Sequence, residues 1–235
     1  MLLVSISVLS ENTSSARRRN EPKDSVRIAV FGGSLSVNPP SQAAKNEWRQ
    51  KLTARVTDYG VGGAGFSSLQ GHSLQIQACE ASADHDIYIL WASTNDFKNS
   101  RECGTWSDYT QEDGFDESKL TTQCGGINYC IKTILEKNPH ARILFFTPLR
   151  FFSDPSGSSP FDKDVNATGK TFAEYVEAQI DCCRHYGIPV LDQFSLQGVN
   201  ELNYKYFYKA DKLHMTEEGY RFIAPLQVSF MARFL

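Results

Sequence analysis

Short apolar runs alternate along the chain with longer stretches of amphipathic, helical character. The run at 86–91, DIYILW, is continuously apolar after its first residue, as expected of a central strand in a parallel sheet with both faces buried. The pattern predicts five strands, at 26–31, 54–59, 86–91, 141–146 and 190–192. It predicts helices at 42–53, 69–82, 127–136, 170–186 and 216–230.

This alternation predicts a doubly wound parallel α/β sheet in one domain over 25–235. Residues 99–121 are polar and predict a surface insertion, and 149–169 carry turn residues that predict a long loop. In a sheet of this kind ligands bind beyond the carboxyl ends of the strands. Candidate chemistry is therefore expected directly after each predicted strand.

Composition and charge narrow the class of protein. The chain has 235 residues, of which 41% are hydrophobic and 22% charged, as in an ordinary globular domain. Lys plus Arg number 24 against 27 Asp plus Glu, a formal net charge of −3, which argues against nucleic acid as a partner because phosphate binding needs a basic face. The sequence has no run of about 18 apolar residues, so no membrane span is expected.

The first 24 residues differ from the rest. Residues 1–10 are apolar but lack a basic leading segment, and three arginines follow at 17–19. We expect 1–24 to be a tail outside the fold, either a truncated export signal or a misassigned start. An exported location, periplasmic or extracellular, is favoured over a cytoplasmic one.

The six cysteines form no C-x-x-C pair, so a zinc ribbon or a thioredoxin-like motif is not expected. In a chain of this length they are best interpreted as buried thiols. Cys103 and Cys124 flank the predicted insertion and are a candidate pair in an oxidising compartment.

Polar groups follow three of the predicted strands. Ser34 comes directly after two glycines, Asn95 lies in the segment STND, and Asp211 precedes His214 by three residues in DKLH. Each has an ordinary structural explanation, as a turn serine, a turn asparagine, and a surface aspartate beside a helix-capping histidine. Together they supply the nucleophile, amide donor, base and orienting acid that acyl transfer requires.

The glycine run at 60–65 has two interpretations. It matches G-x-G-x-x-G, the motif of dinucleotide binding. However, it follows the second predicted strand, and Asp96 lies too far along the chain to bind a ribose in the usual way. The alternative is that one of these glycines presents a backbone N–H to an oxyanion.

In this order the motifs resemble those of the SGNH hydrolases, also called GDSL esterases, over about residues 26–230. The matching blocks are FGGSLS (31–36), YGVGG (59–63), STND (93–96) and DKLH (211–214). The resemblance implies that Ser34 is the nucleophile, His214 the base and Asp211 its partner. It also implies an oxyanion hole formed by the backbone N–H groups of Ser34 and Gly63 and by the side chain of Asn95.

The resemblance further implies a flavodoxin-like three-layer α/β/α sandwich, no metal or other cofactor, and hydrolysis of esters of carbohydrates or lipids. Two positions depart from the family pattern: Gly33 replaces the Asp of G-D-S, and Ser93 replaces the Gly of G-x-N-D. The missing Asp is not a reacting group, so we expect the chemistry to survive, with Ser93 narrowing the pocket near Asn95.

Three questions about ligands remain open at this point. The substrate is expected to be a short acyl ester of a carbohydrate, and the alternatives are a non-catalytic binding module on the same fold or a dinucleotide-binding protein. The aromatic residues at 204–208, and Phe151 and Phe152, form either a sugar-stacking wall or core packing. The segment Asp84-His85-Asp86 is interpreted as a solvated turn rather than a metal site, because it begins a strand at the end of the sheet opposite the other candidates.

Overall fold

A single parallel sheet lies at the centre of the molecule. The computed structural model describes residues 25–69, 71–152 and 165–235, and in these residues the sheet has five strands in the order β2-β1-β3-β4-β5. This is the flavodoxin-like order, so the predicted fold is confirmed. The strands are β1 (Val26–Gly32), β2 (Ala54–Asp58), β3 (Ile87–Trp91), β4 (Arg142–Phe146) and β5 (Val190–Leu191).

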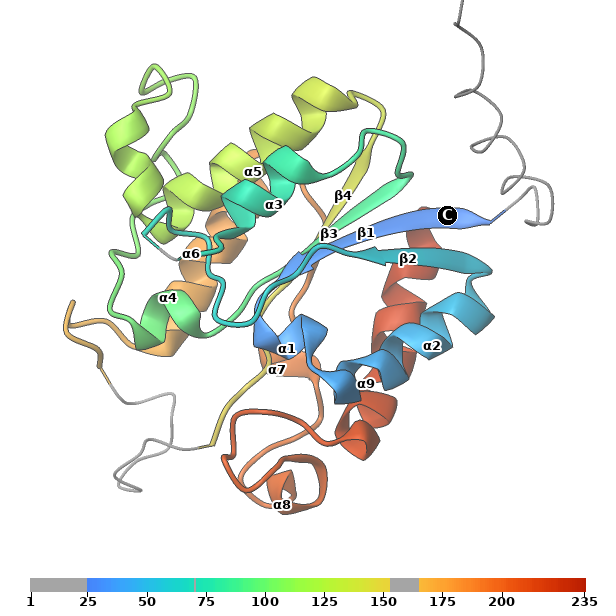
Figure 1. Cartoon of the computed structure of the whole chain (residues 1–235). Helices are drawn as coiled ribbons and strands as arrows, with labels where there is room; N and C mark the ends of the chain where they lie inside the picture. The colour runs from blue at the N-terminus through green and yellow to red at the C-terminus, as the bar shows by residue number, and fades with distance from the viewer. Residues whose placement is uncertain (1–24, 70, 153–164) are drawn as a thin grey trace, which may run out of the picture.

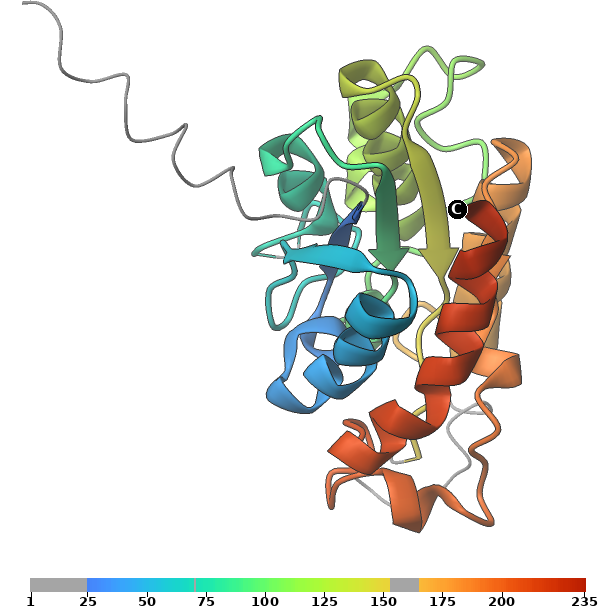
Figure 2. The same ribbon diagram turned by 90° about the vertical axis from the view of Figure 1, so that its right-hand side faces the viewer.

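The longer helices cover both faces of this sheet. On one face α2 (Gln42–Lys51) packs beside α9 (Glu217–Met231), as Figures 1 and 2 show. On the other face lie α3 (Leu74–Glu80), α5 (Gln123–Lys137) and α6 (Phe172–His185). The result is the expected three-layer sandwich, and each face of the sheet has its own apolar core.

Alternate residues of each strand enter opposite cores, which explains the continuous apolar runs in the sequence. Trp91 of β3 packs against Trp48 of α2 at a ring-centroid distance of 5.8 Å. On the other face Phe145 of β4 stacks on Phe66 at 5.7 Å. These side chains are all fully buried, so the central strands are held firmly from both sides.

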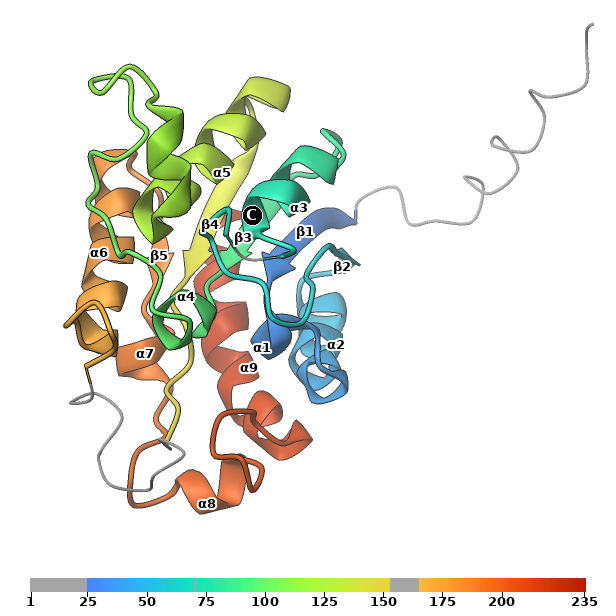
Figure 3. The ribbon, with the colours of Figure 1, turned by 60° about the vertical axis from the view of Figure 1, so that its left-hand side comes forward.

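The register of the strands aligns their carboxyl ends. Gly32 of β1 lies opposite Trp91 of β3, which in turn lies opposite Phe146 of β4. Residues that follow these positions therefore meet at one edge of the sheet. Four helices of four residues each also lie toward this end (Figure 3), and the periodicity of the sequence did not predict them: α1 (Ser34–Val37), α4 (Asn95–Lys98), α7 (Gln193–Leu196) and α8 (Tyr204–Phe207).

Two of the predicted helix boundaries were wrong by several residues. The helix predicted at 69–82 begins only at Leu74, and the helix predicted at 127–136 begins earlier, at Gln123. The early start of α5 includes two glycines, which usually weaken a helix. A Cβ atom on Gly126 would lie 2.2 Å from the carbonyl oxygen of Phe66, so glycine here allows the helix to approach the loop after β2.

The insertion at 99–121 is less exposed than predicted, since Cys103 and Tyr109 are buried within it, and its end forms the 3₁₀ turn Glu117–Thr121. Two further 3₁₀ turns span Pro39–Ser41 and Ala232–Phe234. All six cysteines are free thiols, and all except Cys79 are buried.

The predicted tail, 1–24, lies outside the described residues, as does 153–164 of the predicted loop. Among the helices that the structure describes, none has the length and apolar character needed to cross a bilayer.

Candidate active site

Ser34 stands on a tight turn at the carboxyl end of β1. It is the first residue of α1 and is half-buried, and Gly33 provides the N-cap of that helix. Gly32 is held between two hydrogen bonds to the buried side chain of Gln77, which accepts from its N–H at 2.8 Å and donates to its carbonyl oxygen at 3.1 Å. A Cβ atom on Gly32 would lie 2.4 Å from Oγ of Ser36, so the turn needs glycine at this position.

His214 and Asp211 lie on one short loop before α9. The Nδ1 atom of His214 is 2.7 Å from Oδ2 of Asp211. The other carboxylate oxygen, Oδ1, accepts from the backbone N–H groups of Leu213 at 3.0 Å and His214 at 2.9 Å. Burial alone would raise the pKa of Asp211, but these hydrogen bonds outweigh it and lower that pKa below its ordinary value. The carboxylate is therefore kept charged beside the imidazole.

Two segments that lie far apart in the sequence meet in this site. The Nε2 atom of His214 lies 2.9 Å from Oγ of Ser34, although the residues are 180 positions apart. A carboxylate only accepts hydrogen bonds, so Asp211 favours the tautomer with the proton on Nδ1. Nε2 is then the acceptor, and the Ser34 hydroxyl donates to it.

Asn95 is the first residue of α4, and its side chain lies next to the turn that carries Ser34. Its Nδ2 atom donates to the carbonyl oxygen of Ala64 at 2.8 Å and to Oγ of Ser93 at 3.1 Å. The same atom would lie 2.9 Å from a Cβ atom on Gly33, so the amide is next to the residue that precedes the serine. The structure therefore brings Asn95 to the site that the sequence predicted.

Gly63 belongs to the loop that carries Ala64. Its φ angle is +84°, a conformation that glycine adopts without strain. In the part of the chain that the structure describes, the backbone N–H groups of Gly63 and Ser34 donate to no protein acceptor. Both groups can thus serve a ligand.

Asp96 was not predicted to have a role in this site. It is 1% exposed, and its two carboxylate oxygens accept from the backbone N–H groups of Phe66 at 2.7 Å and Ser67 at 3.0 Å. Asp96 therefore ties α4 to the loop of Gly63. In the sequence, only the position of Asp96 in the STND segment indicated a role. Its hydrogen-bond partners could not be predicted, because they lie about 30 residues away along the chain.

The glycine run at 60–65 does not have the context of a dinucleotide site. That motif requires a helix to begin at the glycines, so that the helix N-terminus faces the phosphates. Here α3 begins at Leu74, and the intervening residues form turns. The prediction that a helix follows the glycines closely was wrong, and the motif match is accidental.

The aromatic residues at 204–208 mainly pack the last loop. Tyr208 is 5% exposed and its hydroxyl donates to the carbonyl oxygen of Arg150 at 2.6 Å. Tyr204 stacks on Phe152, and Phe207 stacks on the exposed ring of Phe222 in α9. Tyr206 is the exception, because 72% of it is exposed.

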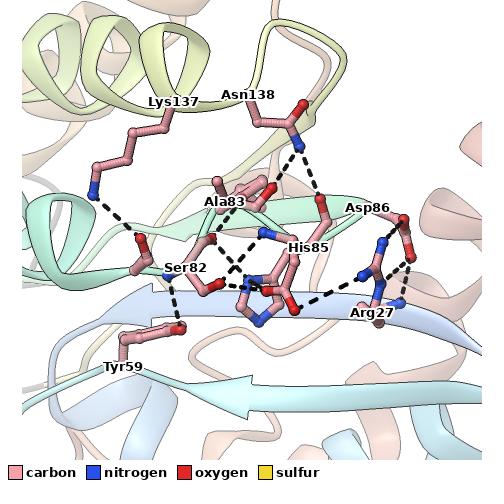
Figure 4. A network of polar contacts seen from close by, with 11 residues as sticks. Arg27, Tyr59, Ser82, Ala83, His85, Asp86, Lys137 and Asn138 are labelled. Atoms are coloured by element: carbon pink, nitrogen blue, oxygen red, sulfur yellow. Dashed lines mark hydrogen bonds and ion pairs between the residues drawn. The ribbon is translucent and has the colours of Figure 1, made fainter.

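Asp84-His85-Asp86 forms a structural network at the opposite end of the sheet (Figure 4). Asp86 accepts from Nη2 of Arg27 at 2.7 Å, and His85 is buried with Nδ1 3.1 Å from the carbonyl oxygen of Ser82. No group of three or more potential metal-ligating side chains occurs among residues 25–69, 71–152 and 165–235. The network joins the starts of β1 and β3.

Comparison with protein families identifies the group to which this architecture belongs. The model of the GDSL-like lipase/acylhydrolase family matches residues 29–222, which include every candidate residue described above. The chain belongs to this family. As a GDSL-like acylhydrolase it is an ester hydrolase. A comparison with curated proteins found no match.

Solved structures share the fold of this GDSL-like chain at low sequence identity. A protein from Lactobacillus plantarum is 20% identical with a TM-score of 0.74, covering 89% of this chain and 98% of its own. A possible lipase from Chitinophaga pinensis is 20% identical with a TM-score of 0.67 and the same coverage. The inhibitor-bound aryl esterase of M. smegmatis is 15% identical with a TM-score of 0.61, covering 90% of this chain and 100% of its own.

Proposed function

We propose that this GDSL-like protein hydrolyses carboxylic esters through an acyl-enzyme formed on Ser34. The observation that carries the proposal is the chain of hydrogen bonds from Ser34 Oγ to His214, at 2.9 Å, and from His214 to Asp211, at 2.7 Å. This is the arrangement of nucleophile, base and orienting acid that activates a serine.

In the first half of the reaction Ser34 Oγ attacks the ester carbonyl carbon, and its proton passes to Nε2 of His214. Asp211 stabilises the imidazolium that forms. The tetrahedral intermediate collapses, the bond to the leaving alcohol breaks, and His214 gives the proton to that alcohol. In the second half His214 takes a proton from a water molecule, which attacks the carbonyl carbon of the acyl-enzyme. The bond to Ser34 Oγ then breaks, His214 gives the proton to Oγ, and the acid leaves.

We assign the oxyanion hole to three donors. They are the backbone N–H groups of Ser34 and Gly63, which have no protein acceptor among the described residues, and Nδ2 of Asn95 beside Gly33. Donors fixed in advance around the developing charge are usually the largest single contribution to such catalysis.

For the substrate we propose a short acyl group on a carbohydrate. Phe97, two residues after Asn95, is 6% exposed and packs into a cluster with Phe172 and Tyr175, and we base the preference for a small acyl group on this filled volume close to Asn95 in the chain. The exposed ring of Tyr206, on the helix before the Asp211 loop, is suited to stacking on a sugar.

Labelling with a fluorophosphonate probe and mapping of the modified peptide test the mechanism. We expect modification at Ser34, none in Ser34→Ala, and greatly reduced labelling in His214→Ala. A protein that binds ligands but is not labelled would instead be a non-catalytic module, and labelling at another serine would refute the assignment.

The substrate proposal has a separate test. Hydrolysis of p-nitrophenyl acetate should exceed that of the decanoate ester, and acetate should be released from an acetylated oligosaccharide. Tyr206→Ala should raise KM for the oligosaccharide only. A preference for the decanoate ester would refute the short acyl group.

A further inference from the structure

The two departures from the family motifs occupy the same place in space. A Cβ atom on Gly33 would lie 2.9 Å from Cβ of Ser93, 2.9 Å from Nδ2 of Asn95 and 2.6 Å from the carbonyl oxygen of Ala64. Non-bonded heavy atoms do not approach this closely, so Ser93, Asn95 and the Ala64 carbonyl together leave residue 33 no room for a side chain. Ser93, in the loop after β3, thus fills part of the volume that glycine leaves open directly after β1.

The hydroxyl of Ser93 is fully engaged in hydrogen bonds. Ser93 is 3% exposed, and its Oγ donates to the carbonyl oxygen of Ala64 at 2.7 Å. It accepts from the backbone N–H of Asn95 at 3.2 Å and from Nδ2 of Asn95 at 3.1 Å. A serine hydroxyl has one proton and two acceptor sites, so its capacity is used completely. The hydroxyl thus has no hydrogen-bonding capacity left for a ligand, and the narrowing of the pocket by Ser93 stays a prediction.

These bonds fix the orientation of the Asn95 amide. Nδ2 faces two acceptors, Oγ of Ser93 and the carbonyl oxygen of Ala64. If the amide were flipped, its oxygen would face the carbonyl oxygen of Ala64 and the hydroxyl oxygen of Ser93, whose only proton is already donated. Each contact would then bring two hydrogen-bond acceptors together, which is unfavourable. The nitrogen is therefore held on the side of Gly33 and Ser34.

We propose that Ser93 is a positioning residue for the oxyanion donor Asn95, and that Gly33 and Ser93 work as a pair. The proposal rests on the proposed function, because it assumes that Asn95 Nδ2 stabilises the oxyanion. During reaction the N–H that donates to the neutral Ser93 oxygen turns to the negatively charged oxyanion, and this charge-assisted bond is the stronger of the two. Ser93 thus directs the amide at rest and releases it when charge develops.

A double-mutant cycle separates positioning from a merely structural role. Ser93→Ala keeps the Cβ atom that fills the volume beside Gly33 and removes only the hydroxyl. We expect kcat for p-nitrophenyl acetate to fall about 10-fold with KM little changed, less than the loss of about 10²–10³-fold that removal of the donor itself causes in Asn95→Ala. In the Asn95→Ala background, Ser93→Ala should cause no further loss, because it acts through that amide.

The outcomes distinguish this proposal from the proposed function. If Asn95→Ala lowers kcat but Ser93→Ala lowers it by the same factor in both backgrounds, Ser93 does not act through Asn95 and the inference is overturned. Unchanged kcat in Ser93→Ala overturns it as well. If Asn95→Ala itself retains full activity, or Ser34 is not labelled, the failure lies in the proposed function. Circular dichroism of each variant establishes that the fold is kept.

The shared volume has its own test. Gly33→Ala should lower the free energy of unfolding, because its Cβ atom meets Ser93, Asn95 and Ala64. Gly33→Ala with Ser93→Gly should recover part of that loss in urea unfolding, because one of the three opposing groups, the Cβ of Ser93, is gone. A double variant no more stable than Gly33→Ala would refute the pairing.

Discussion

Lys45 is a buried cation that joins the Ser34 turn to the end of β2. Its side chain is 0% exposed, and Nζ donates both to the carbonyl oxygen of Ser36 and to Oδ2 of Asp58, whose side chain is 27% exposed. Burial lowers the pKa of Lys45, and the charge of Asp58 opposes that shift. The ammonium group is thus kept charged inside the protein mainly by one carboxylate.

Because Lys45 is buried and Asp58 is partly exposed, removing one of them should change the free energy of unfolding by a different amount than removing the other. In Lys45→Met the buried carbonyl of Ser36 keeps the hydroxyl of Ser41 as a donor and Asp58 regains water, so the free energy of unfolding should fall by only about 0.5–1.5 kcal/mol. In Asp58→Ala the ammonium stays buried without a counter-charge, so the loss should be larger, about 3–5 kcal/mol. The double variant should resemble Lys45→Met, because the stranded charge is gone.

Urea unfolding followed by circular dichroism at pH 7 measures these differences, provided that the slope with denaturant is the same in all four proteins. Two results would contradict this role of Asp58: a loss in Asp58→Ala no larger than that in Lys45→Met, or losses that simply add in the double variant. Either result would mean that the ammonium group does not depend on Asp58.

Three further predictions concern the site and the opposite end of the sheet. Asn95→Ala should lower kcat by about 10²–10³-fold without a comparable change in unfolding, measured with p-nitrophenyl acetate. Asp96→Asn places an amide where two backbone N–H groups need an acceptor and should lower the free energy of unfolding by about 1–3 kcal/mol. The exposed Asp116→Asn is its matched control, and an equal effect of both would contradict this role for Asp96. Arg27→Gln should be less stable than the native protein above about pH 4, the ordinary pKa of an aspartate. The hydrogen bond from Arg27 lowers the pKa of Asp86, so the difference in the free energy of unfolding should shrink as the pH falls through that lowered pKa. Urea unfolding at pH values from 7 to 3 measures the difference, and a constant difference would refute the prediction.

The sequence predicted the parts of the fold and site that local patterns determine. The strand at Ile87–Trp91 was evident because both of its faces are buried, and Asp211 and His214 were evident because their spacing lets one short loop hold both. The short helices α1 and α4 were not, because four residues are too few to show a periodicity.

Contacts between distant segments escaped prediction for a different reason. The bonds of Asp96 to the loop at 66–67 and of Gln77 to Gly32 join residues 29 to 45 positions apart. Their side chains are ordinary polar residues whose partners are backbone groups, which no motif identifies. The early start of α5 was missed because the carbonyl of Phe66, which closely approaches Gly126, comes from elsewhere in the chain.

The meeting of Ser34 and His214 links activity to completion of the polypeptide. Ser34 leaves the ribosome early, whereas the imidazole emerges only with the last few dozen residues, and α9 must still dock beside α2. A nascent or prematurely terminated chain that stops before Asp211 carries the Ser34 hydroxyl without the imidazole of His214. On the proposed mechanism such a fragment would not cleave esters while it is being made, so esterase activity would report a folded chain that includes His214.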